Sequence, residues 1–471
     1  MAMKRLIAVL LAAALLCAAQ TQLPDTPAAR QFSAWLEAFN TGDRAVLLEF
    51  LQKNDPSRAA GIDQEFGFRT QTGGFDLKKV EQSTPTRLTG LVKERASDQF
   101  ARFTIEVEPS EPHRIAQLNL RAIPQPPEFP MPRMSQDTAI AALRAEMEKA
   151  AAADHFSGAV LLAKDGKAVF TAAYGLADRE KKIPNKLDTR FRIGSMNKMF
   201  TAVSVLQLVQ AGKIKLTDPL GKYLTDYPNP DVASKVTIHH LLTHSGGTGD
   251  FFGPQFDAHR LELRTFEDYV KLYGKRGLEF EPGSRWQYSN YGFLLLGVLI
   301  EKVTGQSYYD YVLEHVYKPA GMTSTASLPE DQAVPERSVG YMKSDGDHVW
   351  KPNTDTLPYR GTSAGGGYST VEDLLRFANA LQRHKLLDAQ HTELLTAGKM
   401  DAPNGGKYAY GFFDQSVGGV RCFGHGGGAP GMNGDLRVCP QSGYVIAVLA
   451  NLDPPAAQRI ADFAANRLPE K

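Results

Sequence analysis

The sequence predicts an α+β protein, with a small α+β domain preceding a larger domain built on a mixed antiparallel sheet with flanking helices and an inserted helical lobe. An Asp165-Gly166 turn marks a hairpin early in the larger part. The following stretch, 217–385, is mostly helical or loop, and strand patterns return after residue 408. Five prolines within 123–132 are typical of an extended linker between the two parts. A chain that opens and closes one sheet places an active site where the sheet meets the inserted lobe.

The N-terminus has the pattern of a secretory signal. Lys4-Arg5 precede an apolar run over 6–16, and small residues follow it. The run is too short to span a bilayer. We therefore expect residues 1–19 to be a signal peptide, cleaved after Ala19, and the mature protein to be secreted, in the periplasm, with no membrane span. Cys17 suggests a lipoprotein box, but Leu16 stands where such a box has a small residue, so no lipid anchor is expected.

Charge and cysteine content exclude some classes of function. The 471-residue chain has 53 Lys and Arg against 52 Asp and Glu, a net charge of +1 that becomes −1 without Lys4 and Arg5. With no basic stripe, nucleic acid is not an expected partner. Only Cys422 and Cys439 remain in the mature chain, too few for a metal framework but able to pair in an oxidising compartment.

Residues 24–122 form the predicted small domain. Helical patterns cover about 27–39 and 43–52, and two alternating strands follow, at about 101–107 and 116–122. Helices followed by antiparallel strands indicate an α+β module. The stretch 38–43 resembles the start of a nuclear-transport-factor-like (cystatin-like) cone domain, which can hold a ligand or form a dimer. No catalytic constellation is visible there, so we expect an accessory domain, joined through the linker 123–134 to a catalytic domain over 135–468.

Ser195 and Lys198 form an S-x-x-K pattern at the start of an apolar helical stretch, 195–212, that a glycine closes. Spacing of three puts both side chains on one helix face. A serine hydroxyl needs a base to become a nucleophile, and a buried lysine can be that base. At the start of the helix, the dipole would also favour developing negative charge.

Two further motifs follow in order, Y-x-N at Tyr288 and Asn290 and H-x-G at His425. Each alone has an ordinary structural explanation, as a packed turn or a glycine-rich turn. With S-x-x-K they resemble the penicillin-recognising serine hydrolases: class C β-lactamases, D-alanyl-D-alanine carboxypeptidases, D-aminopeptidases and esterases of the β-lactamase/transpeptidase-like fold. The resemblance covers about residues 137–465, is closer to class C, and includes three supporting stretches, at 241–247, 364–370 and 444–451.

The resemblance implies roles for these residues. Ser195 is the nucleophile, and Lys198 with Tyr288 relays its proton. Which of the two is the base stays open, because a phenolate at neutral pH requires Lys198 to lower the pKa of Tyr288. Asn290 would hydrogen-bond the acyl-side amide of the substrate.

The H-x-G strand would supply the remaining contacts. The backbone N–H groups of Ser195 and Gly428 would form the oxyanion hole. Gly426 and Gly427 would let substrate backbone lie close along the strand. His425 would also bind substrate, and it stands where the lactamases of this family have lysine. An unperturbed histidine is mostly neutral at pH 7, so it can donate a hydrogen bond but attracts a carboxylate more weakly, which argues against fast turnover of carboxylated lactams.

Two other motifs are weaker candidates. Ser363 lies in G-x-S-x-G, but the preceding stretch, 354–360, is polar and contains a proline, whereas a nucleophile elbow follows an apolar strand. His240 and His244 have metal-like spacing, but no glutamate follows His240 as in a zinc protease helix. We expect no metal and no cofactor.

The last two strands predict a disulfide. If the strands of Cys422 and Cys439 turn near residues 429–432, both cysteines lie equally far from the turn and therefore opposite each other.

The sequence therefore favours a secreted serine hydrolase that forms an acyl-enzyme on D-amino-acid peptides or amides, cell-wall fragments or esters. The alternatives are a class C-type β-lactamase and a non-catalytic sensor or binding protein of the same fold. The expected partner is a small-molecule or peptide substrate. The sequence leaves the natural substrate and the oligomeric state open.

Overall fold

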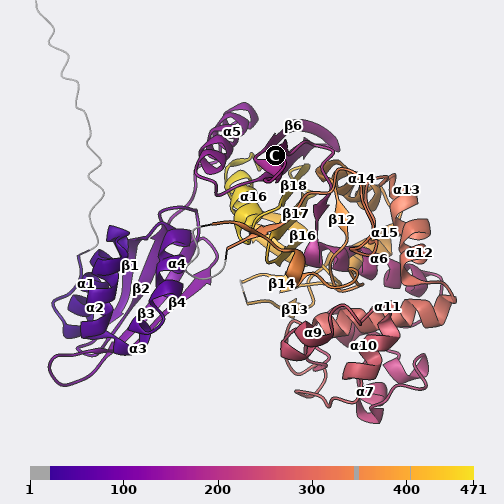
Figure 1. The fold of residues 1–471 in the computed structure, drawn as a ribbon, viewed down its shortest axis with the longest axis horizontal. Helices are drawn as coiled ribbons and strands as arrows, with labels where there is room; N and C mark the ends of the chain where they lie inside the picture. The colour runs from indigo at the N-terminus through magenta and orange to yellow at the C-terminus, as the bar shows by residue number, and fades with distance from the viewer. Residues whose placement is uncertain (1–21, 344–348, 404, 471) are drawn as a thin grey trace, which may run out of the picture. The chain divides into compact units, whose positions relative to one another are not determined.

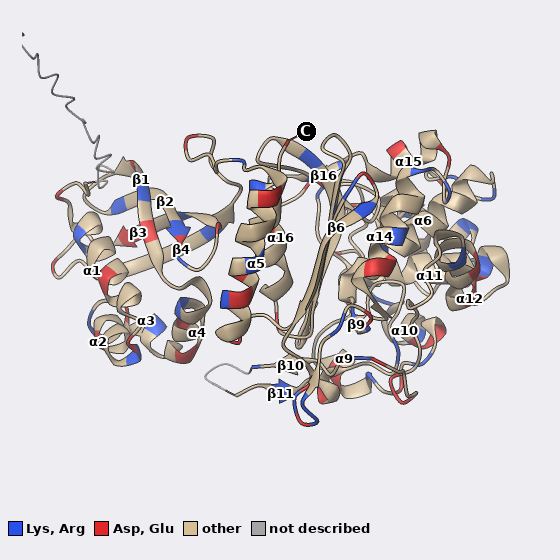
Figure 2. Cartoon of the chain, turned by 90° about the horizontal axis from the view of Figure 1, so that it is seen from above, with Lys and Arg blue, Asp and Glu red and all other residues tan. Residues whose placement is uncertain are grey.

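The computed structural model describes residues 22–343, 349–403 and 405–470. The predicted signal peptide lies outside this part of the chain. The chain divides into two compact units, Met1–Ala122 and Ile123–Lys471 (Figure 1). Basic and acidic residues are interspersed in both units (Figure 2). Within the described residues, no helix combines the length and apolar character needed to cross a membrane.

The first unit places four helices before a four-stranded antiparallel sheet whose strands pair in chain order. Phe32 of α1 stacks on Phe103 of β3 with ring centroids 3.9 Å apart, and Trp35 and Phe39 extend this aromatic core. The elements are α1 (Pro27–Thr41), α2 (Arg44–Asn54), α3 (Pro56–Ala59), α4 (Ile62–Thr72), β1 (Phe75–Ser83), β2 (Arg87–Glu94), β3 (Phe100–Val107) and β4 (Ile115–Ile123).

The second unit is organised around an eight-stranded antiparallel sheet in the order β13-β14-β15-β16-β17-β18-β5-β6. The last strand of the chain, β18, pairs with β5, the first strand of the unit, so the sheet is opened and closed by the two ends of the domain. This confirms the predicted fold class. The strands are β5 (Gly158–Lys164), β6 (Lys167–Tyr174), β13 (Met400–Asp401), β14 (Lys407–Tyr408), β15 (Phe413–Val417), β16 (Val420–Ala429), β17 (Met432–Cys439) and β18 (Tyr444–Ala450).

Both faces of this sheet are covered. Successive side chains of a strand point to opposite faces, so Leu161 and Ala447 belong to the core under the helical lobe, whereas Val160 and Ile446 face α5 (Gln136–Ala152) and α16 (Ala456–Arg467). Figure 2 shows the sheet edge-on between these two helices and the lobe. Strands that are buried on both faces have nearly continuous apolar sequences, as β5 and β18 have.

The inserted lobe contains the two helices that position the site, α6 (Asn197–Gln210) and α11 (Asn290–Thr304). Both are buried along most of their length, because the lobe surrounds them with shorter elements. These include α7 (Pro230–Lys235), α8 (Ile238–Leu242), α9 (Pro254–His259), α10 (Phe266–Tyr273), α12 (Tyr308–Val312), α13 (Lys318–Ala320), α14 (Val371–Gln382) and α15 (Ala389–Thr396). Short strand pairs join β9 (Phe191–Arg192) to β12 (Tyr368–Ser369), β7 (Leu176–Asp178) to β8 (Ile183–Pro184), and β10 (Tyr341–Met342) to β11 (Lys351–Pro352).

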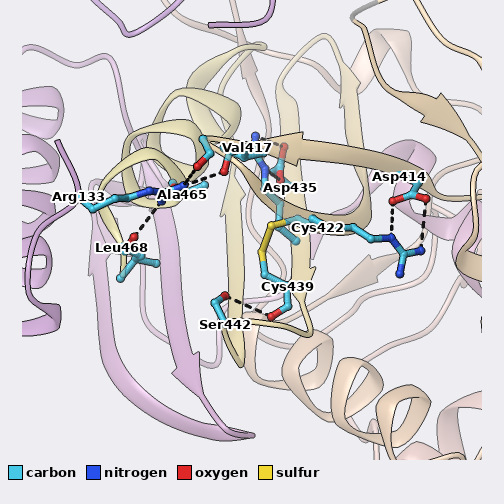
Figure 3. The surroundings of a disulfide bond; sticks show 12 residues. Arg133, Asp414, Val417, Cys422, Asp435, Cys439, Ser442, Ala465 and Leu468 are labelled. Carbon is cyan, nitrogen blue, oxygen red and sulfur yellow. Dashed lines mark hydrogen bonds and ion pairs between the residues drawn. A yellow bond between two sulfur atoms is a disulfide. The ribbon is translucent and has the colours of Figure 1, made fainter. Parts of the chain in front are cut away.

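A disulfide joins Cys422 of β16 to Cys439 of β17 (Figure 3). The hairpin closes at Ala429 and Met432, and its register continues to Phe423 opposite Val438, one residue before the cysteines. Figure 3 also shows the Arg133 guanidinium, which donates to the carbonyls of Val417, Ala465 and Leu468 and so ties the start of the second unit to its end.

Candidate active site

Ser195 lies in a tight turn between a strand and a helix. The turn, Gly194–Met196, is a 3₁₀ segment, and α6 begins only at Asn197, so Ser195 precedes the α-helix rather than opening it. Gly194 has φ of +52°, a conformation that favours glycine. Ser195 is half-buried, whereas its neighbours in the turn are buried. The turn thus leaves the Ser195 side chain partly accessible, as the nucleophile of an S-x-x-K motif must be.

Lys198 is fully buried one helical turn after Ser195. Its Nζ donates to Ser195 Oγ at 3.2 Å, to Asn290 Oδ1 at 2.7 Å and to the carbonyl of Ala364. Burial disfavours the charged ammonium and lowers the pKa of Lys198 to about 7, against a partial opposing effect of the Asp250 charge. A large fraction of Lys198 is therefore neutral near pH 7, with a lone pair within reach of the Ser195 hydroxyl.

Tyr288 lies over the same lysine. Lys198 Nζ is 4.6 Å from the centroid of its ring, and Ser195 hydrogen-bonds its hydroxyl. Burial raises the pKa of Tyr288 above that of an ordinary phenol, although the Ser195 hydrogen bond opposes the shift. The condition that Lys198 should lower this pKa is therefore not met in the free protein. Tyr288 remains a phenol, a proton donor, while the neutral form of Lys198 is the group of the pair that can accept a proton near pH 7.

Asn290, the first residue of α11, has both side-chain atoms engaged. Its Oδ1 accepts from Lys198, and its Nδ2 donates to Asp250 Oδ2 at 2.8 Å. The expected contact with a substrate amide can use only the remaining hydrogen-bonding capacity of this side chain. Asp250, which the sequence analysis did not single out, comes from the loop before α9, and only its place a few residues after the 241–247 stretch could have signalled it.

His425 lies on β16 with both ring nitrogens occupied. Nδ1 meets the carbonyl of Gly426, which can only accept, so Nδ1 carries the proton, and Nε2 accepts from the Tyr408 hydroxyl at 3.1 Å. Burial, together with the nearby Lys198 charge, lowers the pKa of His425 to about 3. The ring is thus neutral at physiological pH and has no free donor for a substrate, whereas the sequence argument expected it to donate.

His244 also lies in the site, beside Tyr288. Its Nδ1 accepts from the backbone N–H of Ser289 at 3.1 Å, and its ring packs 4.2 Å from that of Tyr288. Burial holds the pKa of His244 well below its usual value. His240, the other half of the metal-like pair, accepts instead from the N–H of Thr237 at the start of α8. The described residues contain no group of three His, Cys, Asp or Glu side chains suited to a metal ion.

The glycines of β16 lie close to neighbouring parts of the second unit. A Cβ on Gly427 would lie 1.9 Å from the carbonyl oxygen of Ile193, and one on Gly426 would lie 3.0 Å from Gln458 Nε2. The lack of a side chain at Gly427 therefore serves the close approach of β16 to the nucleophile turn.

Gly428 lies against the same turn, since a Cβ on Gly194 would be 3.1 Å from the Gly428 nitrogen. Pairing with β15 ends at Gly424, whereas pairing with β17 continues to the hairpin. In an antiparallel hairpin, hydrogen-bonded and non-hydrogen-bonded residue pairs alternate, here starting from the hydrogen-bonded closing pair Ala429–Met432. The N–H of Gly428, the next residue, therefore points away from β17, toward the edge of β16 that β15 leaves unpaired.

Ser363 is not placed for catalysis. Its side chain is completely buried, and its Oγ donates to the carbonyl of Phe293 in α11 at 2.9 Å. The loop of Ser363 nevertheless borders the site, because the next carbonyl, that of Ala364, accepts from Lys198.

Comparisons with known proteins find relatives of this chain in sequence and in fold. A profile of the Beta-lactamase family matches residues 141–470. Penicillin-binding protein 4* of Bacillus subtilis (strain 168) is 30% identical over 295 residues, which cover 59% of this chain and 64% of that protein. The chain thus spans just under two thirds of that relative's length.

Two solved structures share the fold of the second unit. A penicillin-binding protein from Bacillus halodurans is 34% identical with a TM-score of 0.61, covering 67% of this chain and 98% of that one. A D-stereospecific amidohydrolase from Streptomyces sp. is 31% identical with a TM-score of 0.60, covering 69% and 97%. With a family profile matched over most of its length, this chain belongs to the Beta-lactamase family, the penicillin-recognising serine hydrolases.

Proposed function

We propose that the protein is a serine hydrolase that forms an acyl-enzyme at Ser195 and acts on D-amino-acid amides or peptides, cell-wall fragments or esters. The observation that carries the proposal is the contact of the Oγ of a half-buried Ser195 with a fully buried Lys198, 3.2 Å away, whose pKa is about 7. A surface lysine would be charged at neutral pH and could not accept a proton.

In the acylation step, neutral Lys198 takes the hydroxyl proton of Ser195, and Oγ attacks the substrate carbonyl carbon. The C=O electron pair moves onto oxygen, which the N–H groups of Ser195 and Gly428 would stabilise; the place of the Gly428 nitrogen against the turn that carries Ser195 supports this role. When the intermediate collapses, the bond to the leaving group breaks. Tyr288 gives the departing nitrogen or oxygen a proton and regains one from the Lys198 ammonium. Water then attacks the acyl-enzyme by the same steps in reverse.

Substrate preference follows from His425. The position is neutral and its donor is occupied, so it offers no positive charge to a substrate carboxylate. This favours amides and esters over carboxylated lactams, and it makes a class C-type β-lactamase the weaker proposal. The solved amidohydrolase with 31% identity is D-stereospecific, which supports placing D-amino-acid amides first among the substrates.

The other predicted features remain proposals. Export by residues 1–19 to the periplasm would provide the oxidising compartment that the Cys422–Cys439 bond requires. The first unit would serve as a packing or ligand-binding accessory, and it lies outside the family match, which begins at residue 141.

Turnover of a panel of D-amino-acid amides, short-chain esters and nitrocefin, with Ser195→Ala as control, tests the proposal. We expect amide or ester hydrolysis that the control lacks, and covalent labelling by a fluorophosphonate probe. A wild-type protein that neither labels nor turns over any of these compounds would instead be a binding protein of this fold.

A further inference from the structure

Behind the Ser195–Lys198 pair lies a carboxylate that the motifs do not include. Asp250 Oδ2 accepts from Asn290 Nδ2 at 2.8 Å and from the Asn290 backbone N–H at 3.3 Å. Its Oδ1 accepts from the N–H groups of Phe251, at 2.6 Å, and Phe252, at 3.2 Å. Four donors thus fix a carboxylate at the N-terminus of α11, where the helix dipole also favours a negative charge.

The backbone around Asp250 is held equally firmly. Arg276 Nη1 donates to the Asp250 carbonyl at 2.6 Å. Ser289, which caps α11 by accepting from the N–H of Gly292, donates its hydroxyl proton to the carbonyl of Gly249. The loop is therefore fastened to the start of α11 just before the carboxylate and to Arg276 at the carbonyl of Asp250 itself.

An asparagine side chain can be turned over, exchanging Oδ1 and Nδ2. Lys198, when protonated, can only donate, so it needs Oδ1 of Asn290. A carboxylate can only accept, so Asp250 attracts Nδ2. Both contacts require the same orientation of the Asn290 amide. The series of hydrogen bonds from Asp250 through Asn290 and Lys198 to Ser195 therefore has one consistent pattern of donors and acceptors.

Among the residues that the structure describes, Asp250 is also the one formal negative charge that acts on Lys198. The other groups facing the lysine are the Tyr288 phenol, the buried imidazoles of His244 and His425, and the carbonyl of Ala364. None of these carries negative charge near pH 7, whereas the Asp250 charge raises the pKa of Lys198 against the effect of burial.

We propose that Asp250 is a positioning residue for acylation: its carboxylate sets the orientation of the Asn290 amide and supplies the counter-charge that keeps Lys198 able to hold the proton it takes from Ser195. The inference rests on the proposed function of the Ser195–Lys198 pair. A residue that only capped α11 would affect stability and leave the titration of Lys198 unchanged.

The test is the rate of fluorophosphonate labelling of Ser195 as a function of pH in Asp250→Asn. We expect the rate to fall by about 100-fold, the scale of a misplaced catalytic group. We also expect the midpoint of its rise with pH to move down by about one unit, since loss of an opposite charge favours neutral Lys198. Asp257→Asn is the matched control, an exposed carboxylate of α9 that should change neither quantity.

Asp250→Glu keeps the charge but displaces it. The Asp250→Glu variant should be labelled slowly by the fluorophosphonate, with the midpoint of its pH profile unchanged from wild type. It provides the test if Asp250→Asn does not fold. A wild-type rate in a folded Asp250→Asn, or a reduced rate with an unmoved midpoint, would overturn the inference. So would a wild-type rate in Asp250→Glu. Failure of the wild-type protein itself to label would overturn the proposed function instead.

Discussion

Ser195 and Ser363 both lie in serine-hydrolase sequence patterns, and both lie next to the helical lobe of the second unit. Ser195 is half-buried beside a buried lysine, whereas Ser363 is fully buried and its hydroxyl donates to a helix carbonyl. The Ser363 loop still contributes to the site, but through the backbone carbonyl of Ala364. A motif therefore specifies residue spacing, while burial and the neighbouring base decide which serine can react.

The largest expected effect separates these two serines. Ser195→Ala should abolish fluorophosphonate labelling and lower turnover by at least about 1,000-fold, because it removes the only atom that can form the acyl bond. Ser363→Ala should label at a rate close to wild type. The measurement is labelling of both variants under the same conditions, and the opposite pattern would place the nucleophile at Ser363.

The base beside Ser195 gives the next effect. Lys198→Ala should reduce labelling by about 100- to 10,000-fold, the usual contribution of general base catalysis, and Tyr288→Phe should reduce amide turnover on a similar scale. Neither should unfold the protein, as circular dichroism can verify.

Wild-type labelling should depend on pH through Lys198. Only its neutral form accepts a proton, so the rate should rise as pH increases through about 7 and level off above. His425 should add no step between pH 5 and 9, because its pKa lies near 3. A profile flat from pH 5 to 9 would show that Lys198 is not the base.

His425 extends the comparison of site residues to the choice of substrate. A neutral His425 with an occupied donor lacks the charge that lysine provides in the lactamases of this family. We expect the best ester or D-amino-acid amide to be hydrolysed at least about tenfold faster than nitrocefin, the scale of one modest interaction. Nitrocefin turnover that rivals the best amide would favour the lactamase alternative.

A smaller, structural effect concerns the strands that carry His425 and Gly428. Reducing a disulfide that closes a loop of this length should lower the free energy of unfolding by about 3 kcal/mol. Thiol titration of the exported, denatured and unreduced protein should find no free thiol at Cys422 or Cys439. Two free thiols would contradict the pairing seen in the structure.

The sequence was informative where spacing determines structure. The residue count from the turn placed Cys422 opposite Cys439, and the order of strands predicted a sheet closed by both ends of the domain. It missed α4, whose buried residues are only Ile62 and Thr72, because such a helix has no apolar periodicity. It also missed Asp250, since a lone aspartate in a loop has no pattern until the fold brings it to Asn290.

The smallest expected effect returns to Ser363. Its Oγ donates to the carbonyl of Phe293, and a Cβ on Gly297 would lie 2.3 Å from it, so this hydroxyl fills the space that a glycine leaves on α11. Ser363→Ala removes one buried hydrogen bond and one atom of packing, which should lower the free energy of unfolding by about 1 kcal/mol. The equivalent change at Ser195 removes a half-exposed hydroxyl and should cost less stability while abolishing labelling. Urea denaturation of both variants measures the difference, and a Ser363→Ala protein with unchanged stability but no labelling would reverse the roles assigned to the two serines.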